Sequence, residues 1–95
     1  MAGYWMVRTT EIRDQDAIEQ YRKLWPDIGS RYNAKILASR GEHKTVEGED
    51  KPRNLLVEFP TYQDALDCYN DPDYAVAIEY MKKACDRELV IIESN

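Results

Sequence analysis

The sequence contains few of the residues that bind nucleic acids, phosphates or metals. It has 13 basic against 18 acidic residues, a net charge of −5, and no extended basic run. Proteins bind duplex nucleic acids largely through Lys and Arg, which displace counterions, so we expect no nucleic-acid partner. The same charge disfavours anionic membrane surfaces. There is one histidine, no Cys-x-x-Cys pair and no Gly-rich phosphate loop, so we predict neither a bound metal nor a cofactor.

Long apolar segments are also missing. No stretch approaches the roughly 20 apolar residues that cross a bilayer, and the first residues lack the basic and apolar regions of a secretory signal. We therefore expect a cytoplasmic protein without a membrane partner. The two cysteines, Cys68 and Cys85, fall on predicted helices. Buried free thiols are expected in the cytoplasm, and a disulfide is the alternative.

The hydrophobic pattern predicts alternating strands and helices. Because side chains alternate along a strand, Trp5, Val7 and Thr9 share one face of the first strand. Pro26 is expected to kink or break the first helix, and Gly41 to introduce a bulge in a long second strand. The predicted strands cover residues 4–10, 35–47, 54–59 and 89–93. The predicted helices cover residues 15–32 and the region from 61 to 85, which Asn70-Asp71-Pro72 divides in two.

The resulting order, β-α-β-β-α-β, is that of a split βαβ unit. It predicts a single α+β domain over residues 1–95 with a ferredoxin-like fold. Four antiparallel strands form one sheet, the helices cover one face of it, and a hairpin joins the second and third strands. A chain of 95 residues leaves no room for a second core.

The predicted strands are apolar on both faces, although helices cover only one. An antiparallel sheet with one face in water should alternate apolar and polar residues. Residues 4–7, 36–38, 55–57 and 89–92 do not alternate. An exposed apolar patch of several hundred Å² usually marks an interface. We therefore predict a two-fold homodimer in which the uncovered sheet faces pack against each other.

Short motifs along almost the whole chain resemble a known family. The chain is similar to the domain of unknown function numbered 1330, within the dimeric α/β-barrel superfamily. This resemblance implies the ferredoxin-like fold and the face-to-face dimer. Three motifs depart from the family pattern: Glu42 replaces a glycine, Cys68 a tryptophan, and Met81-Lys82 a Leu-Arg pair. The motifs are Gly3-Tyr4-Trp5, Arg40-Gly41, Glu47-Gly48, Arg53, Glu58-Phe59-Pro60, Cys68-Tyr69-Asn70, Pro72-Asp73-Tyr74 and the ending Val-Ile-Ile-Glu at Glu93.

Charged residues provide candidates for proton transfer and for anion binding. His43 is the only histidine and is a candidate general base or haem ligand; the alternative is a histidine on the strand surface or at the interface. Glu58 lies between two apolar residues and is a second candidate acid or base; the alternative is a structural ion pair with Arg40 or Arg53. These arginines are candidates for binding an anionic ligand through paired N–H donors. Structural pairing to Glu47 or Glu58 is the alternative.

Aromatic residues provide candidates for a ligand pocket. Trp5, Tyr69 and Tyr74 are expected to line a pocket between sheet and helices, where the hydroxyl groups would orient a ligand. The alternative is plain core packing.

Two functions follow as expectations. The first is a homodimer in which each protomer binds or converts a small organic molecule in this pocket without a metal. By analogy with the superfamily, an enzyme of this type would carry out proton transfer or cofactor-free chemistry on an aromatic or lactone-like compound. The second is a non-catalytic interaction or stress-response module whose sheet face serves dimerisation. A third, a regulator of a basic partner, rests on charge alone.

Overall fold

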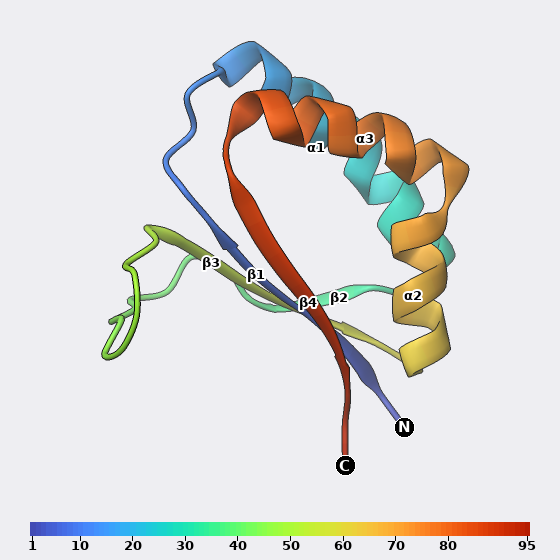
Figure 1. Cartoon of the computed structure of the whole chain (residues 1–95). Coiled ribbons are helices and arrows are strands. Elements are labelled where there is room, and N and C mark those ends of the chain that lie inside the picture. The colour runs from blue at the N-terminus through green and yellow to red at the C-terminus, as the bar shows by residue number, and fades with distance from the viewer.

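A four-stranded antiparallel sheet carries all three helices on one face (Figure 1). The computed structural model describes residues 1–95, and its strands follow the order β2-β3-β1-β4 across the sheet. This arrangement confirms the predicted ferredoxin-like fold, with the second helix divided into two. The elements are β1 (Gly3–Thr9), α1 (Gln15–Arg31), β2 (Lys35–Ala38), β3 (Arg53–Phe59), α2 (Tyr62–Asn70), α3 (Pro72–Ala84) and β4 (Arg87–Glu93).

The side chains of β1, one of the two central strands, alternate between the two faces of the sheet. Trp5, Val7 and Thr9 point towards the helices and are buried, as the alternation predicts. We call this side the inner face. Met6 and the side chains beside it point away from the helices, and this side is the outer face.

Trp5 is the centre of the inner-face core. Its ring lies 5.1 to 6.0 Å from four other aromatic rings, measured between centroids, and its indole N–H donates to the Ala65 carbonyl at 3.0 Å. The hydrogen bond satisfies the one polar atom that a buried tryptophan brings with it. The four rings belong to Trp25, Phe59, Tyr69 and Tyr74.

The helix starts follow the capping chemistry of the sequence. The side chains of Asp14, Thr61 and Asp71 each accept a hydrogen bond from a backbone N–H in the first turn of their helices, at 3.0, 3.0 and 2.8 Å. Pro72 follows its cap at the first helical position, where a missing N–H costs nothing. None of the helices combines the length and the hydrophobicity needed to cross a bilayer.

Gly3 is required where α2 meets β1. A Cβ atom at this position would lie 2.6 Å from the Tyr62 Cα and 2.8 Å from the Thr61 carbonyl oxygen. Both are backbone atoms at the start of α2 and cannot turn aside. A larger residue would therefore push the helix away from the sheet.

Two local predictions from the sequence are corrected. First, α1 continues through Pro26 without the predicted break, because buried Ile18 and Ile28 anchor the helix on both sides of it. Second, β2 ends at Ala38 rather than at residue 47, and its irregularity lies between Ile36 and Ala38 rather than at Gly41. Residues 39–47 have almost no apolar side chains to bury, so pairing with β3 gains little there.

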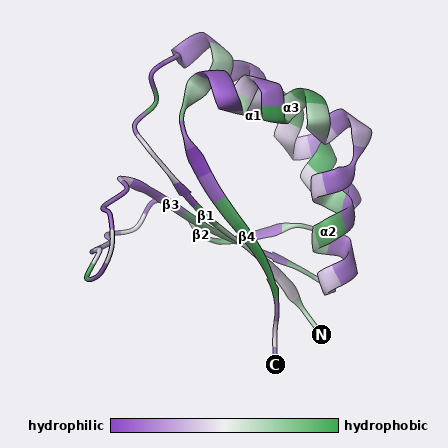
Figure 2. Ribbon diagram, viewed as in Figure 1, coloured by the Kyte–Doolittle hydropathy of each residue, from purple (hydrophilic) through white to green (hydrophobic).

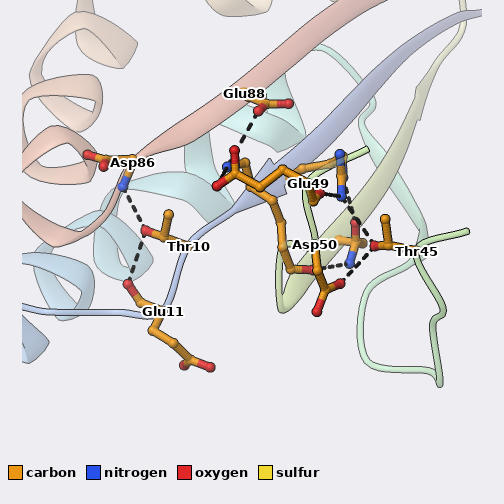
Figure 3. A network of polar contacts seen from close by, with 10 residues as sticks. Thr10, Glu11, Thr45, Glu49, Asp50, Asp86 and Glu88 are labelled. Carbon is orange, nitrogen blue, oxygen red and sulfur yellow. Dashed lines mark hydrogen bonds and ion pairs between the residues drawn. The ribbon is translucent and has the colours of Figure 1, made fainter. Parts of the chain in front are cut away.

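The segment from 39 to 52 forms a long connection, and polar contacts fasten its second half to the strand ends. The Arg8 guanidinium donates to the Glu49 carbonyl oxygen at 2.8 Å, and the Thr45 hydroxyl donates to Asp50 at 2.8 Å (Figure 3). The buried ammonium group of Lys51 lies 3.5 Å from a carboxylate oxygen of Glu49 and 3.5 Å from one of Glu88 on β4 (Figure 3).

Candidate functional site

A cavity of about 380 Å³ lies between α1, α3 and the inner face of the sheet. We call it the inner cavity. Half of its wall is apolar and comes from strands and helices alike, which suits the body of a small organic molecule. These apolar residues are Val7, Ile18, Tyr21, Ile36, Leu55 and Met81.

The charged part of the wall is entirely cationic. Four of the seven arginines of the chain line the inner cavity, and no Asp or Glu does. Arg53 and Arg87 are half-buried strand residues, whereas Arg22 and Arg40 are exposed at the rim. Only Arg22 of these four forms an ion pair, with Glu19 at 2.6 Å. In a protein of net charge −5, the unpaired arginines give this cavity a local positive potential.

Strand register places the two inner arginines on either side of one threonine. Thr9 of β1 lies opposite Arg53 of β3 and opposite Arg87 of β4. Residues directly opposite each other point to the same face, so the three side chains form a row across the inner face. The Thr9 hydroxyl is buried and has no hydrogen-bond partner. Because strands lie about 4.8 Å apart, the arginine backbones are roughly 10 Å apart, within reach of a shared ligand.

A chain of hydrogen bonds leads from Arg87 to the cavity. The Arg87 guanidinium donates to the Tyr74 hydroxyl oxygen at 3.0 Å, and the Tyr74 and Tyr21 hydroxyls lie 2.7 Å apart. Tyr74 is fully buried and has no other acceptor for its proton, so it donates to Tyr21. The Tyr21 proton is then free to point into the cavity that Tyr21 lines.

Burial keeps both phenols neutral. It is the main cause that raises the pKa of Tyr21 and that of Tyr74 above their ordinary value. Neither phenol therefore becomes an anion that would neutralise Arg87. The guanidinium also lies 5.8 Å from the Tyr21 ring centroid and 6.0 Å from that of Tyr74, where the ring faces attract a cation.

The structure brings together only part of the residue set proposed from the sequence. Arg40 and Arg53 line the inner cavity, and neither pairs with Glu58. Trp5 and Tyr74 are buried in the core, and the Tyr74 hydroxyl forms a hydrogen bond with that of Tyr21, which lines the cavity. Tyr69 lines a smaller neighbouring hollow, which shares Met81 and Arg87 with the inner cavity.

Glu58 and His43 lie elsewhere, outside the inner cavity. Glu58 is on the outer face and accepts a hydrogen bond from the Tyr4 hydroxyl at 3.2 Å. His43 is exposed in the 39–52 connection, 3.9 Å from Asp50, and borders a hollow of about 310 Å³ beside Met6 on the outer face. The two candidate proton-transfer residues are therefore not placed where the arginines are.

Sequence reasoning missed Thr9, Tyr21 and Arg87 as site residues. The alternation of β1 did place Thr9 on the same face as Trp5, but its partners across the strands depend on register. Arg87 was outside the predicted last strand, which was expected to begin at residue 89 rather than at Arg87. Tyr21 lies on α1 and was not among the residues proposed for the site.

The two cysteines are free and buried, as predicted. Burial, helped by the negative charge of Asp71, raises the pKa of the Cys68 thiol to about 12. Burial also raises the pKa of the Cys85 thiol. Both thiols are therefore protonated at neutral pH and are poor nucleophiles. No group of three or more His, Cys, Asp or Glu side chains is placed to hold a metal ion.

Lys82, which departs from the family pattern, does not line the inner cavity. Its ammonium group is exposed and lies 3.8 Å from Glu79 on the same helix. The neighbouring Met81 does line the inner cavity. A change from arginine to lysine at position 82 therefore leaves the cationic wall intact.

The outer face carries an apolar surface without a helix over it. Met6 is flanked by Leu56 and Val90, and Tyr4 by Glu58 and Ile92. Met6, Val90 and Ile92 expose 43, 54 and 47 % of their surfaces. Figure 2 shows the corresponding hydrophobic segment in the second half of β4.

Comparison with known proteins gives the family. The model of the domain of unknown function DUF1330 matches residues 2–95. The chain belongs to this family. A comparison of this chain with curated proteins found no match.

Solved structures share its fold at low sequence identity. A protein of unknown function from Rhodopseudomonas palustris is 17 % identical with a TM-score of 0.73, over 99 % of this chain and 83 % of the other. A dimeric ferredoxin-like protein of unknown function from Bacteroides fragilis is 15 % identical with a TM-score of 0.51, over 98 % and 96 %. SnoaB, a cofactor-independent oxygenase from Streptomyces nogalater, is 9 % identical with a TM-score of 0.62, over 99 % and 93 %.

Proposed function

We propose that this DUF1330 domain is a homodimer in which each protomer binds a small organic molecule in its inner cavity. The observation that carries the proposal is the cavity itself. It has a half-apolar wall, convergent polar groups, and a position between sheet and helices. A concave site with an apolar wall and a few oriented donors is the usual form of a small-molecule site.

The outer face supports the dimer. Leu56, Met6 and Val90 form an apolar row across β3, β1 and β4. Ile92 adds to it, whereas Glu58, Arg8 and Glu88 flank the row. A two-fold axis would place this row against its own copy, so that each protomer covers the other. Solved structures with the same fold from Bacteroides fragilis and Thermobifida fusca are described as dimeric.

The two faces therefore have separate tasks in this proposal. Ligand binding uses the inner face and association uses the outer face, so Glu58 and His43 would lie at or near the interface. The free cysteines support a reducing location such as the cytoplasm. The exposed outer face also favours the second candidate, a module whose function is association and whose cavity stays without a ligand.

A thermal-shift panel of small organic acids, alcohols and amides tests the ligand-binding proposal. We expect at least one compound to raise the melting temperature of the wild type. Tyr21→Phe removes the hydroxyl that reaches into the inner cavity, so it should reduce that shift. Tyr69→Phe is the comparison variant, because Tyr69 lines the neighbouring hollow and not the inner cavity itself.

Two results would contradict the proposal. A broad panel that shifts no melting temperature would favour the association module. A shift that Tyr69→Phe abolishes and Tyr21→Phe leaves unchanged would place the ligand somewhere other than the inner cavity.

A further inference from the structure

The inner face concentrates cations that have no acidic partner. Arg53 and Arg87 flank Thr9 in register, and no carboxylate lies within ion-pair distance of either guanidinium. Elsewhere, Arg13 and Arg31 both pair with aspartates. The chain has more carboxylates than it has cations, so the absence of pairing at this site is not a shortage of acids.

An unpaired charge in a partly dry cavity is costly for folding unless something compensates it. A bound anion would supply that compensation. Between the two arginines, the buried Thr9 hydroxyl has a hydrogen bond still to make. The Tyr21 hydroxyl is a further donor that faces the same space. Its oxygen accepts from Tyr74, which in turn accepts from Arg87, so its own proton is left for a ligand.

The geometry points to a small monocarboxylic acid with an apolar body as the ligand of the inner cavity, held by Arg53 and Arg87. This inference rests on the proposed function and names the chemical class that the site takes. The planar guanidinium matches a carboxylate with two parallel N–H donors. Thr9 supplies a third polar contact beneath the carboxylate.

The rest of the wall decides between a carboxylic acid and an inorganic anion. Ile18, Leu55 and Met81 form apolar surface that an inorganic phosphate would leave empty. An aromatic or aliphatic body fills that volume and gains the free energy of leaving water. Arg40 at the rim, which forms no ion pair, attracts the anion to the entrance without having to contact it once bound.

Benzoate is a suitable probe, because benzyl alcohol offers nearly the same shape without the charge. The measurement is a titration followed by NMR, observing the Nε–H signals of Arg53 and Arg87 and the amide of Thr9. We expect benzoate to shift these signals and to bind at least roughly tenfold more tightly than benzyl alcohol. Inorganic phosphate at the same concentration should bind more weakly than benzoate.

Variants test which arginines hold the carboxylate. Arg53→Gln and Arg87→Gln should each weaken benzoate binding by roughly ten- to a hundredfold, because each removes a charge-assisted hydrogen bond. Arg13→Gln removes the same charge at an exposed site outside the cavity and should leave binding unchanged. A circular dichroism spectrum of each variant confirms that it is folded.

The outcomes separate this inference from the proposed function. Benzyl alcohol binding as tightly as benzoate in the inner cavity would overturn the carboxylate assignment and leave the small-molecule site standing. Phosphate binding more tightly than benzoate would also overturn it. Benzoate binding that Arg53→Gln and Arg87→Gln leave intact would move the site away from these residues. No binding of either aromatic probe at millimolar concentration would overturn the inference. The proposed function is judged separately, by the small-molecule panel and by the Tyr21→Phe and Tyr69→Phe variants.

Discussion

The two faces of the sheet differ in the kind of group they present. The inner face is covered by three helices, yet it holds two arginines without an acidic partner. The outer face is uncovered, yet it presents Met6, Val90 and Ile92 to solvent. The covered face therefore holds charged groups, which burial disfavours, and the exposed face holds apolar groups, which contact with water disfavours. The proposals above assign a partner to each face, an anion to the inner face and a second copy of the chain to the outer face.

The largest expected effect compares neighbouring residues on opposite faces. Trp5→Ala should destabilise the fold by about 3–5 kcal/mol, because it empties the aromatic core and leaves the Ala65 carbonyl without its donor. Met6→Ala should cost the protomer far less, because its side chain is 43 % exposed. Urea unfolding of both variants provides the measurement. Equal losses, with no dependence on protein concentration for Met6→Ala, would remove the distinction between the faces.

The next effect concerns association. Val90→Asp places a charge next to Met6 in the apolar row of the outer face, and it should weaken the dimer by roughly a hundredfold or more, because the carboxylate would be buried without a partner. Val76→Asp is the matched control, since Val76 is a similarly exposed valine on α3. Sedimentation velocity across a dilution series compares the two. Equal dissociation of both variants would show that the outer face is not the interface.

The smallest effect contrasts the unpaired cavity arginines with a charge that is well paired. The Tyr32 hydroxyl donates to Asp71 at 2.6 Å, the Asp73 N–H donates as well, and Arg31 lies nearby. Together these partners lower the pKa of Asp71 below its usual value. The resulting stabilisation is complete above the unfolded-state pKa of about 3.9 and is lost as the pH falls through the lower folded-state pKa.

Asp71→Asn keeps the cap acceptor and removes only the charge. The variant should therefore be less stable than the wild type at pH 7, and the difference should shrink as the pH falls below about 4. Thermal unfolding at pH 7, 5 and 3 tests this. A gap that stays constant over that range would mean that the charge of Asp71 contributes nothing.

The sequence predicted the architecture well because the fold depends on patterns that are local. Alternation located β1, the apolar stripe located α1, and Asp71-Pro72 marked the division between α2 and α3. The long second strand was wrong, because the pattern of β-prone residues ends at Ala38 while the backbone connection continues to residue 52. The number of residues between β2 and β3 did not reveal that the connection is a loop held by contacts of Arg8 and Lys51 with Glu49.

The site was less predictable because it depends on register. Arg53 and Arg40 were recognised as possible anion ligands from their residue type. The decisive arrangement of Arg53, Thr9 and Arg87 unites residues from three strands that are far apart in the sequence. Glu58 looked like a buried acid next to Phe59, but alternation turns it to the outer face, where Tyr4 is its partner. Burial of one neighbour is therefore a poor guide to the burial of the next residue in a strand.

The central claim is that the apolar outer face belongs between two copies of the chain. Light scattering of the wild type at micromolar concentration tests it most directly, because it needs no ligand and no variant. The account predicts a mass of about 22 kDa, twice the 11.1 kDa of one chain. A well-folded species of 11.1 kDa that persists as the concentration is raised would contradict it.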